Sequence, residues 1–228
     1  MSSTHLTRTI ITTGDGSKTI HIPDWNENYH SSHGAVQEAK HVFLKHGLEQ
    51  KRDQEHIRIL EIGFGTGLNA ILTLEAGLNF SSKISYDGIE AFPISMEEMK
   101  ALAYDEFLAT NELKAYYQQI HATSWEEAHE ITPQFTLSKI QQEIQKLAFA
   151  PNTYEIIYFD AFGPRVQEDM WTQEIFQKLY DALVPGGIFV TYCAKGQVKR
   201  DLKAVGFLVE ALPGPPGKRE MTRGRKDE

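Results

Sequence analysis

The sequence predicts an α/β fold in which a doubly wound, mostly parallel sheet carries helices on both faces. β-Branched and aromatic runs alternate with segments of helical periodicity over most of the 228 residues. One apolar run, residues 57–62, ends in a turn with three glycines and leads into an amphipathic segment, which is the pattern of strand, tight turn and helix. Strands that alternate with helices form parallel sheets, because parallel neighbours need a crossover connection.

The N-terminal part is predicted to be an appendage to this sheet. Residues 8–22 hold two β-branched runs around Gly14-Asp15-Gly16, which predicts a β-hairpin. Helical spacing follows from residue 34 to residue 46. We therefore expect residues 1–50 to form a hairpin and helix appendage, and residues 51–228 to form the main domain.

The main domain is predicted to alternate strands and helices, with residues 121–153 the least regular part. The expected strands are 57–62, 84–89, 135–140, 155–160, 188–193, 207–211 and a last strand that begins with K-R-E-M-T at residue 218. The expected helices are 66–77, 94–103, 105–118, a polar helix through residue 147, 172–183 and 196–204.

Composition indicates an ordinary globular chain from a reducing compartment. Hydrophobic residues make up 41% and charged residues 24% of the chain, and the single cysteine, Cys193, excludes a disulfide framework. The first nine residues lack the apolar core of a signal peptide, and no run of about 18 apolar residues exists. We therefore expect a cytoplasmic protein with no membrane association.

Charge is distributed unevenly along the chain. The net charge of −8, taken alone, argues against a nucleic-acid partner. Residues 195–226, however, carry nine Lys and Arg residues against Asp201, Glu210 and Glu220. A local basic face of this kind can hold phosphates, although it can equally be a solvated charged end of the chain.

The glycine turn is the strongest pointer to a ligand. Gly63, Gly65 and Gly67 follow a G-x-G-x-G spacing, with Thr66 inside the turn and Glu61 two residues before it. Dinucleotide enzymes use G-x-G-x-x-G, which would need a glycine where Leu68 stands. A carboxylate at position 61 suits the ammonium group of S-adenosylmethionine and repels a pyrophosphate. A turn that only packs strand on helix is the simpler alternative.

Two acidic residues end predicted strands on the side where open α/β sheets bind ligands. Glu90 follows the second strand and suits the two hydroxyls of an adenosine ribose, which NAD and S-adenosylmethionine share. Asp160 ends the strand 155–160 and can orient an amine acceptor and take up its proton, although it can also cap the next turn. Phe162, two residues on, can stack on a base or exclude water.

The later part of the chain favours S-adenosylmethionine over a dinucleotide. Pro185-Gly186-Gly187-Ile188 and the later Gly206-Phe207 are the usual end of a methyltransferase sheet, which oxidoreductases lack. His30 and His33 invite a metal interpretation, but capping or hydrogen-bonding histidines are favoured because methyl transfer needs no metal. The predicted fold is accordingly a Rossmann-like class I S-adenosylmethionine-dependent methyltransferase.

The sequence resembles the tRNA 5-methylaminomethyl-2-thiouridine methyltransferase family, which is the methyltransferase half of MnmC-type enzymes and the stand-alone MnmD type. The matching segments span nearly the whole chain. They are Y-H-S-S-H-G-A-V-Q-E-A-K-H-V-F-L (29–44), L-E-I-G-F-G-T-G-L-N (60–69), F-D-A-F-G-P-R-V-Q-E-D-M-W-T (159–172) and G-P-P-G-K-R-E-M (214–221). The last two segments are specific, whereas the glycine loop is not.

The resemblance implies methylation of the aminomethyl group on the wobble uridine of tRNA, which depends on another enzyme to install that group. It implies a catalytic Asp160, and a cofactor site made by Glu61, Gly63, Gly65, Asn69 and Glu90, with Tyr29 over the methionine end. Two-domain members carry a flavin oxidase after this domain. Because this chain stops at Glu228, we expect the stand-alone form, with no flavin and no metal. Adenine recognition is not assigned, since no clear acidic residue follows the third strand.

The anticodon stem-loop of tRNA is the expected partner. Lys218 and Arg219, with help from Arg223 and Arg225, are expected to hold it, and Phe162 or Trp171 to receive the wobble base. Two alternatives stay open. One is a methyltransferase or aminopropyltransferase acting on a small amine such as a polyamine, and the other is a tRNA-binding module without enzymatic activity.

Overall fold

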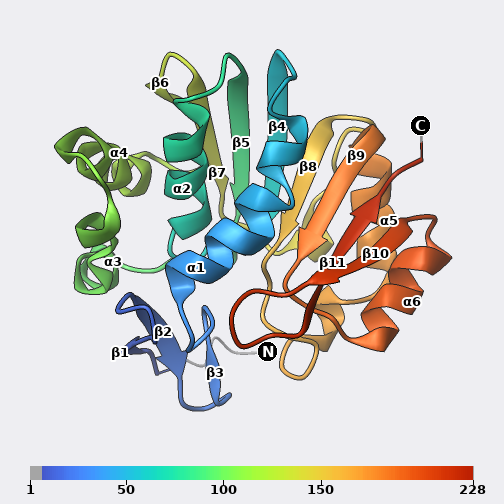
Figure 1. Ribbon diagram of the computed structural model, residues 1–228, viewed down its shortest axis with the longest axis horizontal. Helices are drawn as coiled ribbons and strands as arrows, with labels where there is room; N and C mark the ends of the chain where they lie inside the picture. The colour runs from blue at the N-terminus through green and yellow to red at the C-terminus, as the bar shows by residue number, and fades with distance from the viewer. Residues whose placement is uncertain (1–6, 228) are drawn as a thin grey trace.

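The computed structural model describes residues 7–227 as an eight-stranded central sheet flanked by helices, with a small N-terminal sheet beside it (Figure 1). Residues 1–6, on which the signal-peptide prediction partly depends, lie outside the described residues. In spatial order the central strands are β10 (Leu208–Pro213), β11 (Glu220–Arg225), β9 (Leu183–Thr191), β8 (Tyr154–Phe159), β4 (His56–Ile62), β5 (Lys83–Ile89), β7 (Phe135–Ile140) and β6 (Ala128–Thr132).

The centre of the sheet is parallel and its two ends are antiparallel. Strands β9, β8, β4, β5 and β7 run in the same direction, whereas β6 and the β10–β11 pair run antiparallel to their neighbours. β11 lies between β9 and β10 although it comes last in the chain. The predicted doubly wound, mostly parallel α/β fold is confirmed.

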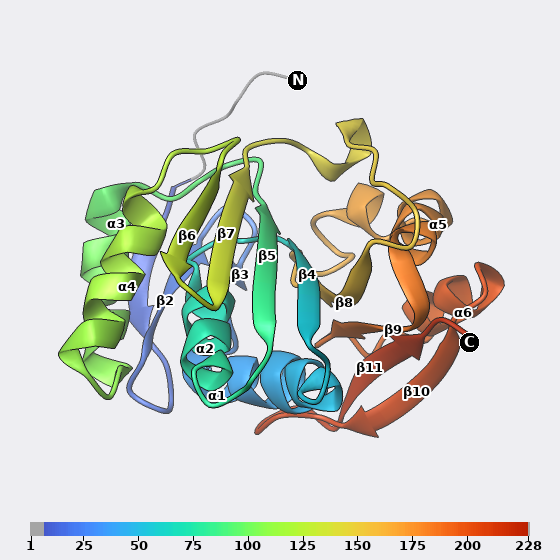
Figure 2. The same cartoon turned by 90° about the horizontal axis from the view of Figure 1, so that it is seen from above.

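Helices cover both faces of the sheet (Figure 2). They are α1 (Ala35–Ala39), α2 (Leu68–Gly77), α3 (Met96–Leu102), α4 (Asn111–Ala122), α5 (Gln173–Ala182) and α6 (Gly196–Ala204). Helices α1, α2 and α4 share one buried cluster with the sheet, and α5 and α6 share the other. No helix within residues 7–227 combines the length and the hydropathy needed to cross a membrane.

Strand β4 shows how the two faces are formed. Ile57 and Ile59 belong to the cluster on the α2 face, whereas Leu60 and Ile62 belong to the cluster on the α5 face. This alternation follows from the period of two in a strand. Glu61 therefore has the parity of Ile57 and Ile59, and its side chain lies on the α2 face of the sheet.

The N-terminal segment forms β1 (Thr9–Thr12), β2 (Lys18–Ile22) and β3 (Glu27–Asn28), so the predicted hairpin is present with one short strand more. The predicted helix over 34–46 is α1, followed by a π-helix at Lys40–Lys45. Buried residues of both these helices join the core on the main sheet. The division of the chain at residue 50 stays a prediction, because nothing tests it independently.

The least regular stretch differs most from its prediction. Strand β6 was not predicted, since Ala128–Thr132 is a short edge strand with a polar sequence. The polar helix predicted to end at residue 147 is wrong, because only the short 3₁₀ turn Ile144–Lys146 forms there. Strand β9 begins at Leu183, ahead of the Pro185-Gly186-Gly187 turn that was expected to precede it.

Candidate active site

One large cavity, of about 1640 Å³, lies at the carboxyl-terminal edge of the parallel strands. The segments that follow β4, β5, β7, β8 and β9 line it, and the N-terminal segment closes it from outside. Ligand pockets commonly measure roughly 300–1,000 Å³, so this cavity has room for a cofactor together with an acceptor. Its position is the one that open α/β sheets use for ligands.

The glycine loop forms the floor of the cavity immediately after β4. Gly65 has a φ of +50°, and a Cβ placed there would lie 3.3 Å from the ring of Tyr29. Thr66 is held from behind, because its carbonyl accepts hydrogen bonds from Tyr117 (3.1 Å) and His121 (3.1 Å). The loop therefore presents bare backbone to the cavity in a fixed conformation, ahead of the first turn of α2.

Asn69, in the first turn of α2, joins two carboxylates. Its Nδ2 donates to Glu61 at 2.8 Å and to Asp160 at 2.9 Å. The other oxygen of Glu61 accepts from Tyr86 at 2.8 Å, and Glu61 does not line the cavity. The predicted direct contact between Glu61 and a cofactor ammonium has no support from this position. Glu61 instead lies one layer behind the cavity and orients Asn69.

Asp160 lies in the cavity wall where β8 ends, as predicted. Its backbone amide donates to Ile62 at 2.9 Å, and a Cβ on Gly63 would lie 2.7 Å from its carbonyl oxygen, so the glycine loop and Asp160 pack directly together. Burial, with the nearby carboxylate of Glu38, raises the pKa of Asp160 to about 7. Asp160 can therefore exchange a proton near neutral pH.

Glu90 follows β5 and also lines the cavity, as predicted. Its two oxygens accept backbone hydrogen bonds at 2.9 Å, from Gly65 and from Phe92. The carboxylate is thus fixed between the glycine loop and the segment after β5. A carboxylate keeps further acceptor positions, which suit the hydroxyls of a ribose.

Aromatic side chains form the cavity wall that faces the glycine loop and the strand-end carboxylates. Phe162 meets Tyr29 and Trp25 edge to face, with ring centroids 5.0 and 5.4 Å apart. Trp171 is 5% exposed and donates its indole N–H to the Phe162 carbonyl at 2.7 Å. Phe162 and Tyr29 therefore line the cavity, as predicted. Trp171 instead packs behind the loop that carries Phe162 and does not line the cavity, so its position does not support the predicted contact with the wobble base.

The basic residues separate into two groups. Lys218 lines the cavity, where it forms an ion pair with the buried Glu38 and lies 4.2 Å from the centre of the Tyr192 ring. The Arg219 side chain beside it is 95% exposed and lies 3.9 Å from the carboxylate of Glu220. Arg223 and Arg225, further along β11, both pair with Glu210. The expected role of Arg223 and Arg225 in binding tRNA thus has no support from their positions.

His30 and His33, the two histidines considered as metal ligands, differ in burial. Neither belongs to a metal-binding cluster within the described residues. His30 is buried beside Thr19 and Tyr104, and burial lowers its pKa to about 4, so it is neutral. Within residues 7–227, no group of three or more His, Cys, Asp and Glu side chains could hold a metal ion. His30 thus acts as the hydrogen-bonding residue that the sequence favoured.

Sequence reasoning missed several residues of the cavity. Gln141 and Gln142 follow β7 and line it at the place where an acidic residue was sought. Glu38 belongs to residues 29–44, one of the segments that carry the family resemblance. Only the fold places it beside Lys218. Arg8 reaches the cavity from the N-terminal segment, and no local pattern in the sequence marks it.

The residues present fit S-adenosylmethionine. Asn69 Oδ1 is buried and has no hydrogen-bond partner in the described part of the chain, so it can accept a bond from a ligand amine. The carboxylates of Asp160 and Glu90 favour a ligand with a cationic sulfonium and ammonium group. The geometry defines a class of protein, an α/β enzyme that binds a nucleoside cofactor at the carboxyl ends of its strands.

Comparison with known proteins defines the family. A model of a family described as S-adenosyl-L-methionine-dependent methyltransferase matches residues 103–227, and the chain belongs to this family. The tRNA 5-methylaminomethyl-2-thiouridine biosynthesis bifunctional protein MnmC of Cupriavidus metallidurans is 30% identical over 229 residues. That match covers 94% of this chain and 33% of the relative, so the chain spans about a third of the length of the curated relatives it matches.

Two solved structures share the fold. MNMC2 from Aquifex aeolicus matches with a TM-score of 0.74 and 24% identity, over 98% of this chain and 72% of the other. Spermidine synthase from Thermotoga maritima matches with a TM-score of 0.52 and 14% identity, over 96% and 71% of the two chains.

Replacing Gly65 should abolish cofactor binding without unfolding the protein. Gly65→Val would force a branched residue into a left-handed conformation and push its side chain toward Tyr29, into the ligand space. Calorimetry with S-adenosylmethionine should show binding to the unmodified protein and none to the variant. Gly16→Val is the control, because Gly16 also has a left-handed φ (+84°) but nothing lies within 4 Å of its Cβ position. Binding of NADH in place of S-adenosylmethionine would overturn the cofactor assignment.

The raised pKa of Asp160 predicts a specific pH dependence of stability. In the unfolded chain this carboxyl has a pKa near 3.8, whereas in the folded chain it is about 7. Between these values the folded state binds the extra proton, so the free energy of unfolding should fall as pH rises from about 4 to 7. Urea unfolding of the unmodified protein and of Asp160→Asn should therefore show the variant gaining relative stability over this range. A constant difference between the two would contradict the raised pKa.

Proposed function

We propose that this chain transfers the methyl group of S-adenosylmethionine to the amine of the aminomethyl group on a tRNA wobble uridine. The observation that carries the proposal is the placement of Asp160 in one cavity with the glycine loop, joined to it through Asn69. The name of the Cupriavidus metallidurans relative supports the choice of substrate. The proposed partner is the tRNA anticodon stem-loop, in the cytoplasm, after another enzyme has installed the aminomethyl group.

Each residue has a role in the proposed reaction. Bound S-adenosylmethionine supplies an electrophilic methyl group. The glycine loop, Asn69 and Glu90 would hold the cofactor, and Tyr29 would cover its methionine end. Asp160 would accept a hydrogen bond from the acceptor amine and orient its lone pair. It would take up the proton released as the new C–N bond forms and the S–CH3 bond breaks, with a neutral thioether as the leaving group. Neither a metal nor a flavin is needed for this step.

Asp160→Asn should retain cofactor affinity and lose turnover. The asparagine keeps the shape and can still accept a bond from Asn69, but it cannot take up a proton. Orientation and proton acceptance together should lower the single-turnover rate by roughly two to four orders of magnitude. The assay adds labelled S-adenosylmethionine to bulk tRNA that lacks the modification, with Asp181→Asn, on the exposed side of α5, as the control.

The same assay separates the proposal from its alternatives. Methyl incorporation into the wobble nucleoside, identified by mass spectrometry, supports the tRNA substrate. Transfer only to a free polyamine would favour the small-amine alternative. The similarity of this chain's fold to that of spermidine synthase is the reason to include this acceptor. Binding of tRNA with no transfer to any acceptor would favour a binding module. A near-normal rate in Asp160→Asn would place the proton acceptor on another residue.

Lys218 and Arg219 should respond differently to substitution. Lys218→Ala should lower stability, because it removes the cation paired with the buried carboxylate of Glu38 and leaves that carboxylate only its hydrogen bond from the Ser31 amide. Arg219→Ala should raise the Michaelis constant for tRNA, because its exposed guanidinium can reach a phosphate. The slope of log affinity against log salt should become shallower by roughly 0.7 to 0.9 for each phosphate that is no longer neutralised. Arg225→Ala, whose partner is Glu210, is the control, and an equal effect of Arg225→Ala would place the tRNA face elsewhere.

A further inference from the structure

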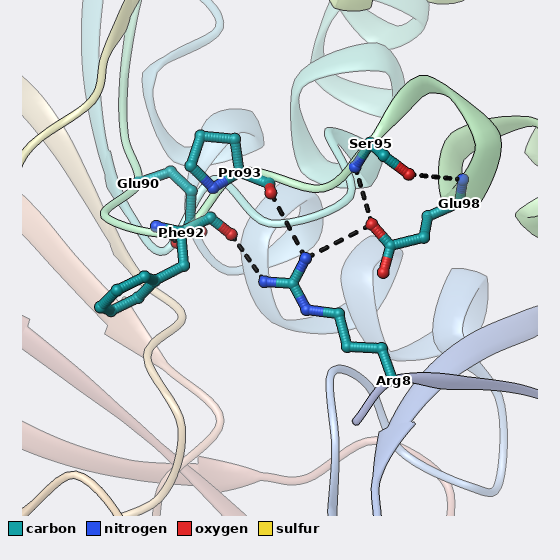
Figure 3. A network of polar contacts seen from close by, with 6 residues as sticks. All are labelled: Arg8, Glu90, Phe92, Pro93, Ser95 and Glu98. Atoms are coloured by element: carbon teal, nitrogen blue, oxygen red, sulfur yellow. Dashed lines mark hydrogen bonds and ion pairs between the residues drawn. The ribbon is translucent and has the colours of Figure 1, made fainter. Parts of the chain in front are cut away.

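Arg8 lines the cavity. It reaches from the N-terminal segment to Phe92, Pro93 and Glu98 (Figure 3). Its guanidinium donates to the carbonyl of Phe92 at 2.7 Å and to that of Pro93 at 3.3 Å. It also pairs with the carboxylate of Glu98 at 3.4 Å. These three acceptors belong to the segment after β5 and to the start of α3, which are more than 80 residues away in the chain.

The segment that Arg8 holds is the one that fixes Glu90. The amide of Phe92 donates to one oxygen of Glu90, and the other oxygen accepts from Gly65 in the glycine loop. Arg8 thus fixes the carbonyl of Phe92 while the amide of the same residue fixes Glu90. Arg8 is therefore connected through Phe92 alone to Glu90, the carboxylate that is expected to bind the cofactor ribose.

The surroundings of Arg8 restrict its position. The capping box of α3 already uses Glu98, because Ser95 donates its amide to the same carboxylate oxygen at 2.7 Å. Arg8 also lies over the ring of Tyr29, 5.8 Å from its centre, and Tyr29 packs on Gly65. A single guanidinium therefore contacts both the Glu90 segment and the aromatic residue on the other side of the glycine loop.

We infer that Arg8 is a positioning residue for the cofactor, which makes the N-terminal sheet a functional part of the cofactor site. This inference rests on the proposed function. Charged hydrogen bonds to two backbone carbonyls set the path of residues 92–93, and that path sets where the carboxylate of Glu90 lies. Without Arg8, only the Gly65 amide would hold Glu90 from a fixed position, and ordering residues 92–93 would become part of the cost of cofactor binding, which weakens it.

The test compares cofactor affinity in matched variants. Arg8→Met keeps the aliphatic stem but removes every donor, and should weaken S-adenosylmethionine binding roughly tenfold or more in calorimetry. Turnover at saturating cofactor should be retained, and Arg8→Lys should restore part of the affinity. Lys18→Met is the control, because Lys18 anchors the same hairpin to the Ala101 carbonyl at the end of α3 without touching the Glu90 segment.

A double-mutant cycle shows whether Arg8 acts through Glu90. The effect of Arg8→Met on cofactor affinity should shrink markedly in a Glu90→Gln background. The reason is that the free-energy effects of two substitutions in one hydrogen-bond network do not add. Full additivity, or an equal loss of affinity in Lys18→Met, would overturn the inference and assign the effect to docking of the hairpin. Unchanged affinity in Arg8→Met would also overturn it. If the unmodified protein binds no S-adenosylmethionine, the proposed function fails as well.

Discussion

The hydrogen bonds from the Asn69 amide to Glu61 and Asp160 organise the centre of this molecule. Glu61 comes from β4, Asp160 from the end of β8 and Asn69 from α2, so one nitrogen joins two strands and a helix where the cavity begins. Two carboxylates this close repel each other, and burial raises the pKa of both. The amide of Asn69 and the hydroxyl of Tyr86 offset this cost with hydrogen bonds. The position of Asp160 therefore depends in part on Glu61 and Tyr86, which do not line the cavity.

The features that could be predicted from the sequence are those encoded by neighbouring residues. The glycine spacing marks a turn after β4, and an acidic residue at the end of an apolar run marks Glu90 and Asp160. The role of Glu61 could not be read in this way. Strand β4 begins with exposed His56 and Arg58 but is buried from Ile59 to Ile62, so nothing local shows that the Glu61 carboxylate lies among buried side chains and not in the cavity.

The remaining differences come from tertiary contacts. Trp171 has the composition of a base-stacking residue, but its indole is buried against Phe159 and Phe176, and only the packing of α5 on the sheet decides this. Glu38 and Lys218 stand 180 residues apart and form one pair. Arg165, in the loop after β8, donates a hydrogen bond to the carbonyl of Trp25 at 2.6 Å, 140 residues away in the chain. The cavity wall opposite the strand ends is therefore made of segments that are far apart in the sequence. Hydrophobic periodicity does not predict that these segments lie together.

The place of β11 has a consequence for the synthesis of the protein. Residues 220–225 leave the ribosome after every other strand of the sheet, yet they lie between β9 and β10. Until they arrive, β9 exposes the unpaired backbone of a buried, apolar strand, which is an open template for another chain. The nascent protein must therefore keep this edge protected during translation, and loss of the final strand would turn an internal seam into a site of aggregation.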